Sequence, residues 1–187
     1  IERILSQVIR FERDISIHLL IETVAALNNL SALATVSLNV KSLCIGMHDL
    51  NAELNADNNE FTNDFIRLKT IAVAKENNLA AIDTPFLDVK NFSELYKRCK
   101  HIKEMGMDGS MCIHPDHVNV INRTFLISEE RTDELGLILA DYTGGCIMSN
   151  GVFIGPPTVK KMRKELGSDK QIPQKNEHTL KPKSFHY

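Results

Sequence analysis

The fold is decided by an apolar run that ends in a carboxylate, Ile15-Ser16-Ile17-His18-Leu19-Leu20-Ile21-Glu22-Thr23. A second run of the same kind follows it, Ser42-Leu43-Cys44-Ile45-Gly46-Met47-His48-Asp49. Short apolar runs of this type are typical of buried strands, and parallel sheets bind ligands beyond the carboxyl ends of their strands. We therefore expect Glu22 and Asp49 to converge on one pocket, where two carboxylates would suit a hard divalent cation.

Both runs belong to a pattern in which a short apolar strand is followed by an amphipathic helix. Strands are expected at 15–21, 42–47, 79–82 and 110–113, and helices at about 4–11, 23–36, 60–76, 92–105 and 115–123. A polar stretch, 51–59, precedes the third of these helices. That helix carries an apolar face made of Phe61, Phe65, Leu68, Ala72 and Val73. Such repeats build parallel sheets, so the fold class is predicted to be α/β.

The pattern changes after the fourth strand. Two helices are expected there, at 128–142 and 156–166, with a break at Gly144-Gly145 between them. From Gly167 onward the chain is polar and poor in apolar residues, which predicts a flexible tail. We therefore expect a βα domain at 1–125, a helical extension at 126–166 and the tail at 167–187.

Composition places the chain among ordinary soluble globular proteins. It has 187 residues, of which 43% are hydrophobic and 25% charged, and its net charge of −2 comes from finely mixed acids and bases. This balance predicts neither nucleic-acid binding nor membrane binding. The four cysteines form no CxxC pair, which favours a reduced, cytoplasmic location.

Polar side chains follow all four expected strands, namely Glu22, Asp49, Asp83 and His114. Each one alone is most often a helix cap or a turn former. Together they favour a site at one edge of the sheet. Two further histidines, His101 and His117, fall on expected helices and are predicted to lie on the surface.

Four segments carry a resemblance to a known family. They are Leu19-Leu20-Ile21-Glu22-Thr23, Gly46-Met47-His48-Asp49-Leu50, Ala81-Ile82-Asp83-Thr84-Pro85-Phe86 and Met107-Asp108-Gly109-Ser110-Met111-Cys112-Ile113-His114-Pro115. In this order and spacing the chain resembles the citrate lyase beta subunit-like family, part of the HpcH/HpaI aldolase and CoA-ester lyase group. Each segment alone is weakly specific, whereas the ordered set, which spans about residues 16–166, is fairly specific.

The resemblance implies the C-terminal half, strands five to eight, of a (β/α)8 TIM barrel of the phosphoenolpyruvate/pyruvate superfamily, followed by a C-terminal helical segment. It implies that Glu22 and Asp49 hold Mg²⁺, which acts as a Lewis acid. The substrate carboxylate would bind at Gly46, Met47 and His48, because a residue without a side chain lets backbone amides approach it.

The same resemblance assigns catalytic roles to Asp83 and His114. Asp83 either orients neighbouring groups or caps the next helix. His114 and Pro115 match the end of the eighth strand, near which CoA esters lie in related enzymes, although a histidine before proline is as often a structural turn residue.

Two departures from the family pattern concern the mechanism. Members that cleave acyl-CoA carry a C-terminal aspartate that serves the neighbouring subunit, and Gly155 stands in its place here. The family's barrel also begins with four more βα units, whereas a barrel needs about 250 residues. The resemblance thus implies a homo-oligomer, a trimer or hexamer, or a fragment of a longer protein.

Three functions follow from these features. The first is a Mg²⁺-dependent carbon–carbon lyase that cleaves a β-hydroxyacyl-CoA such as citryl-CoA or malyl-CoA. The second is an aldolase of the same superfamily that acts on free 2-keto acids. The third is a noncatalytic or truncated subunit that serves in assembly.

Overall fold

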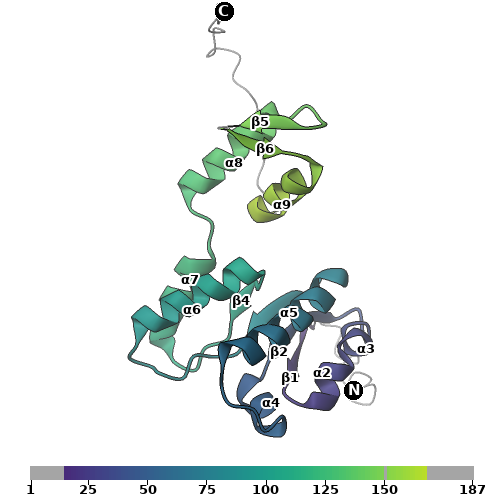
Figure 1. The fold of residues 1–187 in the computed structure, drawn as a ribbon, viewed down its shortest axis with the longest axis vertical. Helices are drawn as coiled ribbons and strands as arrows, with labels where there is room; N and C mark the ends of the chain where they lie inside the picture. Colours follow the sequence, from purple (N-terminus) through teal and green to yellow (C-terminus); the bar gives the residue numbers. More distant parts are fainter. Residues whose placement is uncertain (1–14, 150, 168–187) are drawn as a thin grey trace, which may run out of the picture. The chain divides into compact units, whose positions relative to one another are not determined.

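A computed structural model describes residues 15–149 and 151–167 of the chain. It forms two compact units, of which the first ends at Phe125 and the second begins at Leu126. Each unit has a hydrophobic core of its own, and Figure 1 shows the helices and strands of both. The helix expected at 4–11 and nearly all of the expected tail lie outside the described residues.

The first unit is built on a four-stranded parallel sheet. Its strands are β1 (Ile17–Ile21), β2 (Val40–Ile45), β3 (Ala80–Asp83) and β4 (Gly109–Ser110), and they lie side by side in chain order. In the sheet, Ile21 pairs with Ile45 and Cys44 with Ile82. The predicted α/β class with a parallel sheet is therefore confirmed.

Six helices follow these strands along the chain. They are α2 (Val24–Asn28), α3 (Leu30–Ala34), α4 (Met47–Glu53), α5 (Glu60–Glu76), α6 (Phe92–Met105) and α7 (Pro115–Phe125). Figure 1 shows α5 packed over β2. One face of the sheet meets the helices, and the core there includes Leu43, Ile45 and Ala81. On the opposite face of β1, the side chains of His18 and Leu20 are exposed.

Several element boundaries differ from the prediction because of contacts that a local pattern does not show. The helix predicted at 23–36 is broken at Asn29, whose side chain donates to the Ala25 carbonyl 2.8 Å away. The strand predicted at 42–47 ends at Ile45, since Met47 already starts α4. This helix reaches into the stretch at 51–59, and its buried side chains Met47, Leu50 and Asn51 hold it against the core.

The third and fourth strands are also displaced. The Leu79 N–H donates to the Ala74 carbonyl at the end of α5 (2.8 Å), so β3 starts at Ala80 and includes Asp83. The strand predicted at 110–113 is paired only at Gly109–Ser110. The helices predicted at 60–76, 92–105 and 156–166 are confirmed at both ends.

The second unit is not purely helical. Between α8 (Glu129–Asp141) and α9 (Pro156–Leu166) it contains an antiparallel hairpin of β5 (Ile147–Ser149) and β6 (Val152–Ile154). The prediction of helices alone is wrong at this point, because Gly151 adopts a positive φ of 76° in the turn and Ile154 enters the core. Within 15–149 and 151–167, none of the helices is long and apolar enough to span a membrane.

Candidate functional site

The carboxyl ends of β1 and β2 bring two of the predicted site residues together. Ile21 pairs with Ile45, and the Gly46 N–H donates to the Ile21 carbonyl oxygen at 2.8 Å. Glu22 and Gly46 therefore follow the last pair of this ladder as direct neighbours. The prediction that these two strand ends are adjacent is confirmed by the pairing.

Gly46 lies so close to Glu22 that no larger residue would fit. A Cβ atom built at Gly46 would lie 2.6 Å from Glu22 Cβ and 3.5 Å from Glu22 Oε2. Real Cβ atoms do not approach a neighbouring carbon this closely, and the Cβ and Cα of Glu22 have no freedom to move aside. The missing side chain at Gly46 thus leaves room for the side chain of Glu22 at the end of the sheet.

Asp49 lies in the first turn of α4, the helix that Gly46 begins. Both Glu22 and Asp49 are exposed, and neither carboxylate forms a hydrogen bond or an ion pair with another described residue. Carboxylate oxygens are the ligands that Mg²⁺ prefers, and Mg²⁺ is usually held by one or two carboxylates with water and substrate in its other positions. The two free carboxylates fit this requirement.

Met47 and His48 occupy the first turn of α4 in different ways. The Met47 side chain is buried in the core at 2% exposure, so only its backbone is available to a ligand. His48 is exposed. Gly46, the N-cap residue, has no side chain with which to cap α4. Substrate binding at Gly46, Met47 and His48 stays a prediction.

Asp83 has a different environment from the other acids. It is fully buried within β3, and its carboxylate accepts hydrogen bonds from Arg67 Nε at 3.2 Å and from Arg98 Nη2 at 2.9 Å. These arginines come from α5 and α6, so Asp83 points toward the helices. The structure therefore does not bring it to Glu22, and its bonds are those of a group that positions helices.

The positive charge of Arg67 is surrounded by three carboxylates. Burial alone would lower the pKa of Arg67, but the carboxylates of Asp83, Asp64 and Glu60 together raise it above its ordinary value. Arg67 Nη1 donates to Asp64 Oδ1 at 2.8 Å and to Glu60 Oε2 at 3.3 Å. The guanidinium group is thus charged and held on three sides.

His114 and Pro115 stand at the start of α7, four and five residues beyond the end of β4. His114 Nδ1 accepts a hydrogen bond from the Asp116 N–H at 3.3 Å, which is a local turn contact. β4 and β1 lie at opposite ends of the strand order. The contact favours the turn role, and a catalytic role for His114 stays a prediction.

The two histidines that lie on helices, His101 and His117, differ in burial. His101 is exposed as predicted, and with Glu60 and Asp64 it forms a group whose ligand atoms lie within 4.8 Å of one another. Arg67 already donates to both of these acids, so part of their charge is compensated without a metal.

The prediction that His117 lies on the surface is wrong. It is fully buried, and its ring contacts the rings of Phe86, Phe92 and His114. His117 Nε2 donates to the Val89 carbonyl at 3.1 Å, whereas Nδ1 has no hydrogen-bond partner among the described residues. The available signal for this burial was spacing, because His117 lies four residues before the apolar Ile121 on the same face of α7.

Known proteins resemble this chain in sequence and in fold. The sequence profile named HpcH/HpaI aldolase/citrate lyase matches residues 2–115. Mouse mitochondrial citramalyl-CoA lyase is 24% identical over 154 residues, which cover 77% of this chain and 46% of that protein. The citrate lyase beta subunit of Escherichia coli K12 is 23% identical over 105 residues, or 53% of this chain and 35% of that protein.

A solved structure shows the same fold. It is CitE from Mycobacterium tuberculosis in complex with magnesium, acetoacetate and coenzyme A, with a TM-score of 0.70 at 20% identity over 86% of this chain and 63% of that one. At this identity the likeness shows the fold alone. The chain spans less than half the length of the two relatives named above.

Proposed function

Because the chain belongs to the HpcH/HpaI aldolase/citrate lyase family, we propose that it acts as a Mg²⁺-dependent carbon–carbon lyase on a β-hydroxyacyl-CoA such as citryl-CoA or malyl-CoA. The observation that carries this proposal is the pair of unpaired carboxylates, with Glu22 packed against Gly46 and Asp49 one helical turn beyond. Relatives named citramalyl-CoA lyase and citrate lyase beta subunit support the class of reaction.

In this proposal Glu22 and Asp49 hold the metal. When bound, Mg²⁺ would supply Lewis-acid stabilisation of the negative charge that develops as the carbon–carbon bond breaks. Gly46 keeps the space beside Glu22 open, and the backbone from Gly46 to His48 orients the substrate carboxylate. Asp83 positions α5 and α6 through Arg67 and Arg98, and His114 and Pro115 border the CoA ester.

The proposal extends to the assembly. The four parallel strands are the C-terminal half of a (β/α)8 barrel, and the similarity to CitE over 86% of this chain supports this arrangement. We further propose a homo-oligomer, a trimer or hexamer, in which residues of the second unit cover the pocket of an adjacent subunit.

Gly155 favours two other functions. Since it stands where acyl-CoA-cleaving relatives carry an aspartate, the chain could act as an aldolase on free 2-keto acids, or serve as a noncatalytic subunit. Release of acetyl-CoA from citryl-CoA or malyl-CoA, measured against release of pyruvate from a 2-keto acid, separates the two enzymes. A noncatalytic subunit would release neither product.

The metal site is tested by calorimetry on the 187-residue chain. Titration of oxaloacetate should produce heat only in the presence of Mg²⁺, and Asp49→Ala should abolish this coupled binding. Asp57→Ala is the matched control, because Asp57 is an exposed acid in the loop that follows α4. Coupled binding that survives in Asp49→Ala would show that the metal assignment is wrong.

A further inference from the structure

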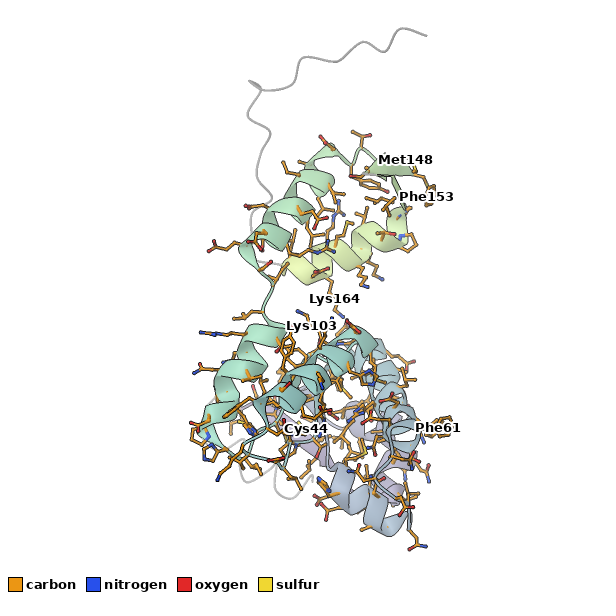
Figure 2. All side chains as sticks on the ribbon, turned by 60° about the vertical axis from the view of Figure 1, so that its left-hand side comes forward. Cys44, Phe61, Lys103, Met148, Phe153 and Lys164 are labelled. Carbon is orange, nitrogen blue, oxygen red and sulfur yellow. The ribbon has the colours of Figure 1, made fainter. Side chains whose placement is uncertain are left out.

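Helix α5 packs Ile66, Ile71 and Ala74 into the core beside buried polar residues, and it exposes a second apolar side. Asn63, Arg67 and Thr70 are buried at 4%, 1% and 0% exposure. Phe61, Phe65 and Leu68 are 86%, 62% and 54% exposed. Figure 2 shows Phe61 pointing away from the rest of the first unit. A surface helix usually carries polar residues opposite its core-facing side, so this second apolar side is unusual.

The orientation of α5 is fixed by the hydrogen bonds of its buried residues. Asn63 accepts from Asn51 Nδ2 at 3.0 Å and donates to Asn58 Oδ1 at 2.8 Å. Arg67 is bonded to Asp83 on the sheet. Rotation of the helix to bury Phe61 and Phe65 would break these bonds and leave buried polar groups without partners, which is unfavourable. The side that carries Phe61 and Phe65 must therefore face outward in the folded chain.

The exposed residues form one straight row. Phe61, Phe65, Leu68 and Ala72 are spaced by four, three and four residues and are all exposed, so they lie along one side of the helix over roughly 16 Å. We call this row the apolar stripe. Contiguous exposed apolar surface of this kind marks interaction sites in soluble proteins.

The apolar stripe is complementary to itself when reversed. If two copies of α5 pack antiparallel about a two-fold axis between Phe65 and Leu68, the large Phe61 of each copy faces the small Ala72 of the other. The same axis places Phe65 opposite Leu68. A two-fold interface requires this kind of self-complementarity, in which the same patch of both copies is used. Antiparallel packing also opposes the two helix dipoles favourably.

The charges beside the stripe agree with the same direction. Glu60 and Asp64 lie on one flank near the start of α5, and Lys75 lies on that flank near its end. Glu60 is exposed, and Lys75 also pairs with Asp108. In an antiparallel pair the acidic start of one helix lies beside Lys75 of the other copy. A parallel pair would place like charges together.

We propose that the apolar stripe is an interface between two copies of this chain, packed antiparallel across a two-fold axis. The two phenylalanines of each copy alone would bury roughly 600 Å² in total, toward the ~1,000 Å² that a specific interface needs. Leu68, Ala72 and the flanking charged side chains contribute the rest. The contact is independent of the proposed enzymatic function.

Sedimentation equilibrium of the 187-residue chain tests the proposal. The wild-type chain should associate reversibly, and Phe65→Glu should weaken this association at least 100-fold, because it places two buried carboxylates at the axis. Leu38→Glu is the matched control, since Leu38 is 96% exposed but lies outside the stripe. Circular dichroism confirms that each variant is folded. Equal association of wild type and Phe65→Glu overturns the proposal, as does a wild-type chain that stays monomeric.

Disulfide trapping tests the antiparallel direction without a charged substitution. In a background with the exposed Cys112 and Cys146 replaced by serine, Phe65→Cys and Leu68→Cys are mixed and oxidised. Mass spectrometry should find more mixed dimers than dimers of either variant alone, because residue 65 faces residue 68 across the axis. An excess of dimers linked 65 to 65 would instead indicate parallel packing, and yields no higher than for Leu38→Cys would overturn the proposal.

Discussion

At the scale of single residues, the contact between Gly46 and Glu22 is what makes the end of the sheet a candidate metal site. The sequence could predict that the two residues are neighbours, because consecutive strands of a βα repeat usually pair. It could not predict a separation too short for a Cβ atom. That separation depends on the strand register, which only the folded sheet defines.

We therefore expect Gly46→Ala to destabilise the fold by roughly 1–3 kcal/mol, since the added methyl group would overlap Glu22 Cβ. It should also weaken Mg²⁺ binding, because Glu22 must move. Urea unfolding and Mg²⁺ calorimetry measure the two effects. Gly109→Ala is the control, because a Cβ there would meet Ile82 Cδ1 at an ordinary 3.4 Å. Equal stability of the two variants would contradict the steric argument.

Asp83 shows where prediction from strand ends fails. Its strand begins one residue later than the pattern predicts and includes Asp83. Alternate side chains of a strand share a face, so Asp83 lies on the same helix-covered face as the buried Ala81. The arginines that bind it, Arg67 and Arg98, come from helices 16 and 15 residues away. No local pattern marks such partners.

At the scale of helices, the bounds of α5 are predictable and its orientation is not. Helical periodicity correctly predicts both ends of α5 and an apolar face. The predicted apolar face is exposed instead. The opposite side of α5 packs Ile66, Ile71 and Ala74 into the core and is hydrogen-bonded to Asn51, Asn58 and Asp83. These three residues belong to other segments of the chain. The direction in which an amphipathic helix faces is therefore a property of its surroundings.

Helix α6 carries a thiol whose ionisation should affect stability. Burial raises the pKa of Cys99 from its ordinary value of 9.0 to about 11, and Cys99 packs with Leu95 and Ile121. Between pH 9 and pH 11 the unfolded chain loses this proton and the folded chain keeps it. The stabilisation is thus fully present below pH 9 and is lost as the pH rises toward 11.

The expected loss from this thiol is about 2–3 kcal/mol in the free energy of unfolding between pH 9 and pH 11. Urea unfolding across this range measures it. Because Cys99→Ala also creates a cavity, the comparison is between slopes against pH and not between absolute stabilities. Cys99→Ala should have the shallower slope, and Cys112→Ala, at an exposed position, should keep the slope of the wild type. Equal slopes in all three proteins would contradict the assignment.

Helix α9 begins at Gly155, although the backbone conformation at this position does not require a glycine. Gly155 is the N-cap residue in an extended conformation (φ −115°, ψ −179°) and offers no side-chain cap. A Cβ there would meet Cys146 Sγ and Phe153 Cε1 at ordinary distances of 3.5 and 3.6 Å. Aspartate is a preferred N-cap residue, and its charge suits the N-terminal end of a helix.

Gly155→Asp should accordingly stabilise the chain by up to about 1 kcal/mol, as measured by thermal and urea unfolding. Gly151→Asp is the contrasting variant, because the φ of 76° at Gly151 strains any side chain, and it should be destabilising. A loss of stability in Gly155→Asp would mean that the cap does not form. Measuring acetyl-CoA release by the Gly155→Asp variant tests whether an acid at this position increases lyase turnover.

At the scale of the whole molecule, a two-fold contact through the apolar stripe restricts the oligomers that can form. An isologous contact joins subunits in pairs, so combined with a three-fold contact it produces a hexamer. The stripe alone produces a dimer. A trimer would leave every apolar stripe uncovered, and sedimentation therefore distinguishes the two proposed assemblies.

Asp83→Asn should alter both stability and assembly. It removes the charge that faces Arg67 within the sheet, and breaking such a buried pair costs about 3–5 kcal/mol. The orientation of α5 depends on the same bond, so self-association should weaken although Asp83 lies outside the stripe. Urea unfolding and sedimentation equilibrium measure the two changes. Asp88→Asn, an exposed acid, is the control, and unchanged association in a folded Asp83→Asn would contradict this coupling.

The ion pair between Arg67 and Asp83 helps to determine which side of α5 faces the sheet. A buried ion pair then decides which side chains the molecule presents to its neighbours. In related sequences, loss of the acid at position 83 or of the arginine at position 67 should be accompanied by loss of the phenylalanines at 61 and 65, because the orientation that exposes them would lose its buried ion pair. The inner and outer sides of α5 are therefore expected to evolve as one unit.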